Sequence, residues 1–185
     1  MHLNKTVAII NIESGNEEAL RQMLEYFGYT VVMYEVGRPQ HFIDLLAGKL
    51  LTKFDFIVIS CHGEDGEIIM PELGEDIYYP DEPRGNFGFN EINKYLTWKD
   101  TCIISIGCTT GDENLAKAFA KNNNTYIAPT DYIEGDSTLM FAVLFFYYLC
   151  SDIHKLDIEA GYKKASSLDS ETNYYIMETN PCPTL

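Results

Sequence analysis

The sequence predicts an α/β fold in a single domain, residues 1–185, in which helices flank a mainly parallel central sheet. Short apolar runs that suit buried strands alternate with segments whose apolar residues recur at the helical period. The 185 residues, 46% of them hydrophobic, suit one domain with a sizeable core. Alternating strands and helices imply right-handed β-α-β units and a parallel sheet covered on both faces.

The strands are predicted from apolar, β-branched runs, and the helix between the first two shows how the helices are recognised. Ser14 and Glu17 have the spacing of a capping box, Ser at the N-cap and Glu three residues on. Apolar residues then recur at helical spacing from Leu20 to Phe27, and Gly28 ends the helix. We expect strands at residues 6–11, 30–36, 54–60, 101–106 and 125–129.

The other helices follow the same rules. Pro39 opens a helix after the second strand, and further helices are expected at 89–96, around Leu115 to Phe119, and at 157–167. The run 139–150 is wholly hydrophobic, but it is shorter than the roughly 20 residues that cross a bilayer. We therefore expect a buried core helix there. The tail after it has no clear period.

One segment breaks the alternation. Residues 64–88 carry many carboxylates, three prolines and a single basic residue. We expect an acidic loop insertion, with a short hairpin around 67–70 followed by a mobile loop. Its carboxylates do not follow the EF-hand spacing, so no metal site is predicted.

Composition excludes several classes of partner. The formal net charge of −15 disfavours nucleic acid and anionic membranes. The five cysteines are odd in number and mostly lie in apolar runs, and the apolar run near the N-terminus is too short for a secretory signal. We expect a cytoplasmic protein with free thiols and no cofactor.

His62 and Cys108 are the candidate catalytic residues. Each follows an apolar run, and ligands of parallel α/β sheets bind outside the carboxyl ends of the strands. If these strands are neighbours, a base and a nucleophile share one edge. Thr110 and Glu113 fit a second capping box, so a helix N-terminus close to Cys108 would stabilise a thiolate. The N–H groups of Gly63 and Cys108 could hold an oxyanion.

The neighbouring Cys61 is expected on the opposite face of its strand, in the core, because successive side chains of a strand alternate.

His-Gly after one strand and Cys-x-x-Gly after the next resemble the caspase-like (clan CD) cysteine peptidases. The His of caspase-type enzymes precedes the Cys by about 50 residues, and here the separation is 46. The closest likeness is to the bacterial CHAT group, whose Cys strand is similar to Ile-Ile-Ser-Ile-Gly-Cys-Thr-Thr-Gly at 103–111. The segments 128–141 and 158–165 are also similar to that group's later strand, loop and helices.

The resemblance implies a three-layer caspase-hemoglobinase fold and a cysteine endopeptidase. It implies His62 as base, Cys108 as nucleophile, and the Gly63 and Cys108 N–H groups as the oxyanion hole. The partners implied are a protein or peptide substrate and a regulatory protein. Specificity does not carry over, because Ile106 stands where members that cut after Arg or Lys often carry Asp, and the family's usual Trp after the fifth strand is missing.

Three carboxylates after the fifth strand are candidates for binding a basic substrate side chain: Asp131, Glu134 and Asp136. The alternative is that they are solvated loop and cap residues.

Two other functions remain open from the sequence. A catalytically inactive caspase-like scaffold would use the acidic loop 64–88 as its binding surface. A glutamine-amidotransferase-like hydrolase would need a His after the Cys, which only His154 could supply, although Leu156 stands where that class carries Glu.

Overall fold

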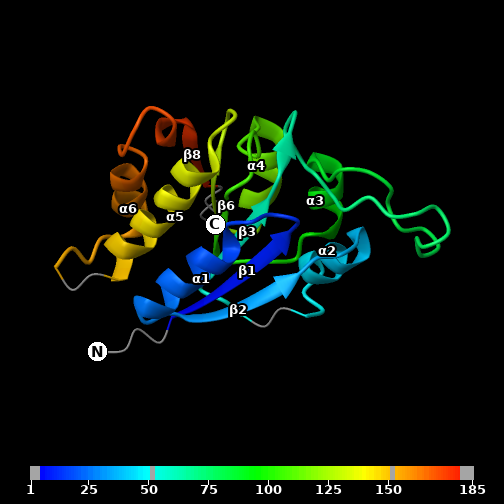
Figure 1. The fold of residues 1–185 in the computed structure, drawn as a ribbon, viewed down its shortest axis with the longest axis horizontal. Coiled ribbons are helices and arrows are strands. Elements are labelled where there is room, and N and C mark those ends of the chain that lie inside the picture. The colour runs from blue at the N-terminus through cyan, green and yellow to red at the C-terminus, as the bar shows by residue number, and fades with distance from the viewer. Residues whose placement is uncertain (1–4, 51–52, 151–152, 180–185) are drawn as a thin grey trace, which may run out of the picture.

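The computed structural model describes residues 5–50, 53–150 and 153–179, and its centre is a six-stranded sheet with strand order β2-β1-β3-β6-β7-β8 (Figure 1). The hairpin of β4 and β5 forms a separate small sheet. In chain order the elements are β1 (Thr6–Ile12), α1 (Glu17–Tyr26), β2 (Thr30–Glu35), α2 (Pro39–Leu46), β3 (Phe56–Cys61), β4 (Gly63–Glu64), β5 (Glu67–Ile68), α3 (Phe89–Tyr95), β6 (Cys102–Ser105), α4 (Glu113–Ala120), β7 (Thr125–Pro129), α5 (Gly135–Cys150), α6 (Ile158–Ala165), a 3₁₀ turn (Thr172–Tyr174) and β8 (Tyr175–Thr179).

The strand pairing confirms the predicted mainly parallel sheet. β1 pairs with β2 and β3, β3 with β6, and β6 with β7, all in parallel. The strands that precede His62 and Cys108 are therefore neighbours. β8 was not predicted and pairs antiparallel with β7 at the edge of the sheet. Its residues are mostly half-buried, so it lacks the continuous apolar run of a central strand.

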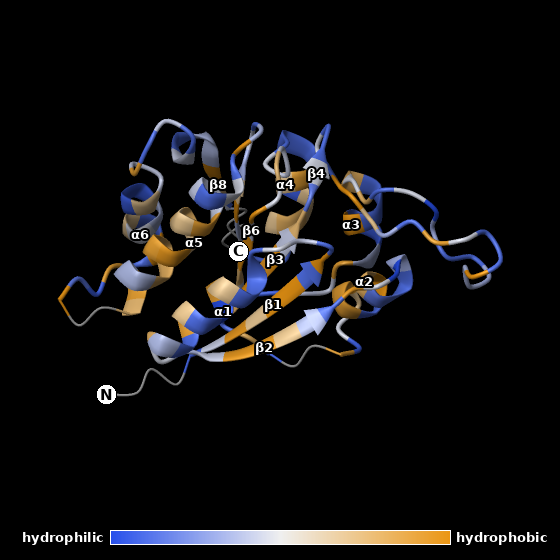
Figure 2. Cartoon of the chain, viewed as in Figure 1, coloured by the Kyte–Doolittle hydropathy of each residue, from blue (hydrophilic) through white to orange (hydrophobic). Residues whose placement is uncertain are grey.

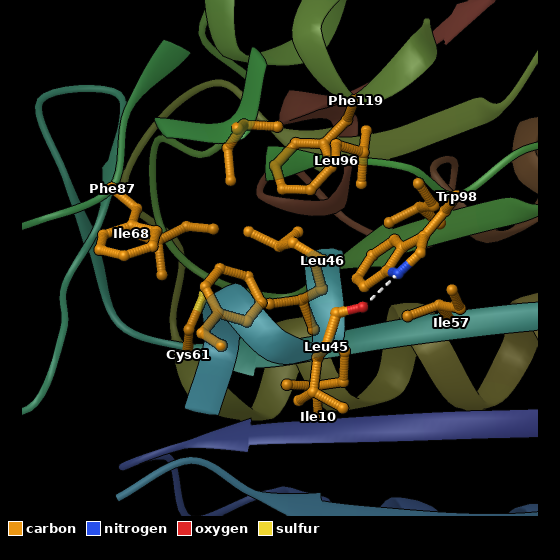
Figure 3. Close-up of a cluster of buried hydrophobic side chains, with 14 of the residues drawn as sticks. Ile10, Leu45, Leu46, Ile57, Cys61, Ile68, Phe87, Leu96, Trp98 and Phe119 are labelled. Carbon is orange, nitrogen blue, oxygen red and sulfur yellow. Dashed lines mark hydrogen bonds between the residues drawn. The ribbon is translucent and has the colours of Figure 1, made fainter. Parts of the chain in front are cut away.

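Helices cover both faces of the sheet, and each face has its own apolar cluster. One cluster joins the sheet to α2, α3 and α4 through residues such as Phe42, Ile92 and Phe119. Figure 3 shows part of it, where the Trp98 indole donates a hydrogen bond of 2.7 Å to the Leu45 carbonyl. The other cluster joins the sheet to α1, α5 and α6. Figure 2 shows β1 as hydrophobic along most of its length, in keeping with burial on both faces.

The apolar run after residue 138 forms most of α5, as predicted. Phe141, Phe145 and Phe146 are fully buried, and the Phe141 ring stacks on Tyr175 of β8. Met140 is 43% exposed, so the helix is buried on one side only. Within the described ranges, none of the helices has the length and apolar character needed to cross a membrane.

The capping box predicted at Ser14 and Glu17 is wrong. α1 begins at Glu17 with Asn16 as its N-cap, and no side chain caps it. The Ser14 hydroxyl instead lies 2.8 Å from the Ser60 hydroxyl on β3. The Ser14 hydroxyl, which the capping-box spacing assigned to the helix N-terminus, is therefore used in a tertiary hydrogen bond.

The second capping box is also misplaced. The N-cap of α4 is Asp112, whose carboxylate accepts hydrogen bonds from the N–H groups of Asn114 and Leu115. Thr110 does not cap the helix. Cys108 therefore lies four residues before the N-cap rather than two, and the helix dipole weakens quickly beyond the terminal turn.

The acidic insertion starts with a hairpin slightly earlier than predicted. β4 pairs with β5 across a turn at Asp65 and Gly66. The rest of the insertion, expected to be mobile, is anchored to the body of the protein through Glu82, whose side chain is fully buried against Arg38.

Candidate active site

His62 and Cys108 follow neighbouring parallel strands at the same edge of the sheet. Ile59 of β3 is paired with Ser105 of β6, and the Ile106 N–H continues the ladder to the Ile59 carbonyl at 3.0 Å. His62 follows directly on β3 and is exposed, whereas Cys108 is partly buried. This edge of the sheet therefore carries an imidazole exposed to solvent and a partly buried thiol.

Two glycines bring the strand ends into direct contact. A Cβ placed on Gly63 would lie 2.0 Å from the Cys108 carbonyl oxygen and 2.9 Å from Cγ2 of Thr110. A Cβ on Gly107 would lie 2.5 Å from Sγ of Cys61. Only residues without a side chain fit at these two positions, because the backbone after β3 packs on the backbone after β6.

The Cys108 turn is held by buried polar groups. The Thr110 hydroxyl, fully buried, lies 2.7 Å from the Gly107 carbonyl and 2.8 Å from the Ser105 hydroxyl. The Tyr126 hydroxyl donates to the Thr110 carbonyl at 2.9 Å. Thr109 has a φ of 56°, a left-handed conformation that non-glycine residues adopt rarely. Sequence reasoning assigned Thr110 to a helix cap and so missed its role in the turn.

The β4–β5 hairpin also docks on this turn. The Gly66 N–H donates a hydrogen bond of 3.2 Å to the Thr109 hydroxyl. Gly66 has a φ of 76°, and a Cβ there would lie 2.7 Å from Cβ of Asp112. Residues that follow Cys108 therefore fix the turn of the hairpin that follows His62.

The loop after β7 lies against Cys108 from the other side. The Cys108 thiol points at the Ile133 carbonyl, with sulfur and oxygen 3.5 Å apart, and the Thr109 N–H donates to the Asp131 carbonyl at 3.2 Å. The structure thus brings the candidate substrate-binding loop to Cys108. The side chains of Asp131, Glu134 and Asp136 are all exposed.

Local hydrogen bonds partly occupy these carboxylates. Asp131 accepts from the N–H of Tyr132 and Asp136 from the N–H of Ser137, each within its own turn. The Glu134 carboxylate has no such bond among the described residues. Loop geometry therefore accounts for one oxygen of Asp131 and one of Asp136, whereas neither oxygen of Glu134 accepts a hydrogen bond from the described residues.

Burial separates two cysteines of the central sheet, Cys61 and Cys102, from the more exposed Cys108. Burial raises the pKa of Cys61 to about 12, and burial also raises the pKa of Cys102, so both thiols stay protonated at neutral pH. Cys61 is 5% exposed, which confirms its expected core position.

Partial desolvation, followed by the nearby carboxylates of Glu64 and Asp65, raises the pKa of Tyr132. The edge around Cys108 is therefore acidic.

His154 does not reach the site. Its ring packs on Tyr147 and Tyr148, with ring centres 5.8 and 5.2 Å apart, near the end of α5. Cys108 contacts the chain just before the start of that helix. At 1.5 Å per residue, Tyr148 lies about 20 Å along α5 from Gly135. The amidotransferase-like alternative, which needs His154 as base, is therefore contradicted.

Within the described ranges, no group of three or more His, Cys, Asp or Glu side chains is arranged to hold a metal ion. His2 and Cys182 lie outside those ranges.

Comparison with known proteins gives a likeness of fold. No family model matches the sequence, and no curated protein matches it. The Arg-specific cysteine proteinase gingipain R matches with a TM-score of 0.55 at 15% identity, over 92% of this chain and 43% of that chain. The complex of the pro- and mature domains of RgpB from Porphyromonas gingivalis gives a TM-score of 0.53 at 15% identity, with coverage of 92% and 44%.

The structure of drICE matches with a TM-score of 0.55 at 16% identity, over 96% of this chain and 88% of that chain. The chain thus spans less than half of gingipain R but most of drICE. Strand order, helices on both faces and these likenesses agree with one another. The chain has the caspase-like α/β fold.

Proposed function

We propose that this protein is a cysteine endopeptidase of caspase-like type, closest to the CHAT group, with His62 and Cys108 as its catalytic dyad. One observation carries the proposal: the strand ends that bear the two residues are packed backbone on backbone through Gly63 and Gly107. The fold, which is that of known cysteine peptidases, supports the same function.

The reaction is acyl transfer through a thioester. The Cys108 thiolate attacks a peptide carbonyl carbon, and the new C–S bond leaves a tetrahedral oxyanion. As the oxyanion collapses, the C–N bond breaks and the His62 imidazolium gives its proton to the leaving amine. A water molecule then attacks the thioester, its proton passes to His62, and the thiolate leaves.

Two N–H groups are free to bind the oxyanion. Ile68 exchanges both of its backbone hydrogen bonds with Phe87, at 2.9 Å each, so Gly63 opposite it keeps its N–H out of the hairpin ladder. Among the described residues, the Cys108 N–H donates to no acceptor. Unpaired donors at a developing charge are what an oxyanion hole requires.

The substrate is a protein or peptide that lies along this edge. The loop of residues 131–136 borders Cys108, which supports it as the substrate-binding loop, with Glu134 the carboxylate most open to a basic side chain.

Cleavage of a peptide library tests the proposal. We expect wild-type protein to cut library peptides, and both Cys108→Ala and His62→Ala to lose cutting by at least a hundredfold. His154→Ala serves as the matched control and keeps full activity. Cleavage that survives in Cys108→Ala would overturn the dyad mechanism, and no cleavage by wild type would favour the inactive scaffold.

A further inference from the structure

The acidic insertion forms one wall of a hollow beside the candidate dyad. Its cavity of about 460 Å³ is within the 300–1,000 Å³ typical of small-ligand sites. The walls come from the segment after β5, the end of the insertion and the residue after β1. Its main lining residues are Glu13, Ile69, Met70, Glu72, Tyr78 and Arg84.

The hollow lies next to His62 along the sheet edge. Ile12 of β1 pairs with Cys61 of β3, and these two adjacent strands lie about 4.8 Å apart. Glu13 and His62 are the residues that directly follow this pair. On the other side, the Ile69 N–H donates to the His62 carbonyl at 3.0 Å. The hollow therefore borders the chain on both sides of His62, through Glu13 and Ile69.

The insertion is a fixed wall of the hollow, because the buried ion pair of Arg38 and Glu82 anchors it to the start of α2. The Glu82 carboxylate accepts from the Arg38 guanidinium at 2.6 and 3.0 Å, from the Gln40 N–H at 2.7 Å and from the Tyr79 N–H at 2.8 Å. The guanidinium also stacks on the Tyr79 ring, with its carbon 3.4 Å from the ring centre. A pair that is hydrogen-bonded on all sides holds the insertion at α2.

The lining suits a side chain with an apolar stem and a cationic head. Arg84 forms an ion pair with Glu75, so the positive charge of the hollow is already matched. In the part of the chain that the structure describes, the Glu13 and Glu72 carboxylates have no cationic partner. The apolar wall includes Met70. Lys and Arg side chains bury their stems on such surfaces and keep their charge at the polar end.

We propose that this hollow is a subsite for a Lys or Arg side chain of the peptide substrate, on the His62 side of the cleaved bond. The assignment as a substrate subsite rests on the proposed peptidase function. Cys108 follows β6 and Glu13 follows β1, two strand spacings away, or about 10 Å. An extended peptide covers that distance with about three residues. The basic residue therefore lies about three positions from the bond that is cut.

Binding without cleavage tests the subsite. The full chain carrying Cys108→Ala is titrated with fluorescein-labelled Ala-Lys-Arg-Ala amide, and with the neutral Ala-Gln-Gln-Ala amide for comparison. We expect tighter binding of the basic peptide. Glu13→Gln with Glu72→Gln should weaken that binding about tenfold, because each exposed carboxylate contributes a factor of up to about five. The basic peptide should also bind less tightly at 1 M salt.

A matched double variant controls for overall charge. Glu25→Gln with Glu159→Gln removes the same charge from α1 and α6 and should leave peptide binding unchanged. Equal weakening by both double variants, or equal binding of the two peptides, would overturn the subsite even if Cys108-dependent cleavage is observed. Binding that depends on Glu13 and Glu72 in a chain that cuts no peptide would keep the cationic site and reject the peptidase.

Discussion

Gly63→Ala is the sharpest test of how the candidate site is built. The added Cβ would lie 2.0 Å from the Cys108 carbonyl oxygen, a distance that must grow by about 1 Å or more before any real contact is reached. The nearest obstructing atom is a backbone oxygen, so rotation of a side chain cannot relieve this clash. Overpacking of this kind costs about 1–3 kcal/mol, and we expect the upper end of that range in the free energy of unfolding.

Gly15→Ala provides the control, because a Cβ at Gly15 meets nothing within 4 Å. We expect its free energy of unfolding to change by about 0.5 kcal/mol or less. Urea unfolding compares the two variants, and the rate of Cys108 alkylation by iodoacetamide reports displacement of the thiol. If Gly63→Ala proved as stable as Gly15→Ala and its Cys108 reacted at the wild-type rate, the strand ends would not be packed as described.

Three further outcomes follow from the same contacts. Thr110→Val removes the hydroxyl bonded to the Gly107 carbonyl, and it should lower the free energy of unfolding by about 1–3 kcal/mol and also lower kcat. Thr110→Ser keeps a hydroxyl and should keep kcat near wild type, as urea unfolding and peptide-cleavage kinetics would show. The Arg38 ion pair lowers the pKa of Glu82 to about 2, so the stabilisation that this carboxylate gives is complete above about pH 4.5 and is lost as pH falls towards 2. Glu82→Gln should therefore lose that part of the pH dependence of stability in acid unfolding curves. Identical curves for the variant and the wild type would contradict this role of the ion pair. Because burial raises the pKa of Cys61 to about 12, iodoacetamide at pH 8 should label Cys108 before Cys61, as mass spectrometry of the labelled peptides would show. Faster labelling of Cys61 would contradict its burial.

The sheet could be predicted from sequence because its central strands are buried on both faces. Such strands appear as continuous apolar runs, and alternation with helices makes them parallel. β8 (Tyr175–Thr179) lacked that signal, since it is a partly exposed edge strand and pairs antiparallel. Its pairing depends on β7, about 50 residues earlier in the chain.

The position of the candidate site could be predicted from the sequence, but the hydrogen bonds and the ion pair that hold it in place could not. His62 and Cys108 stand where parallel strands end, and that position follows from the order of elements alone. Ser14 and Thr110 fitted capping boxes by spacing, but their hydroxyls bond to Ser60 and to the Cys108 turn instead. Local patterns cannot show such tertiary competition. The anchoring of the insertion likewise depends on an ion pair between residues 38 and 82.

The order of the strands explains why both proposed substrate contacts can serve one peptide. Along the edge, Glu13, His62, Cys108 and Asp131 follow β1, β3, β6 and β7 in turn. Three spacings of about 4.8 Å make about 14 Å, which four residues of an extended peptide would cover. Acidic side chains stand at both ends of that span, and the proposed dyad of His62 and Cys108 lies in the middle. A substrate with basic residues on both sides of its cleaved bond could therefore pair with the acidic side chains at both ends of this edge. A substrate with one basic residue could pair with those at one end.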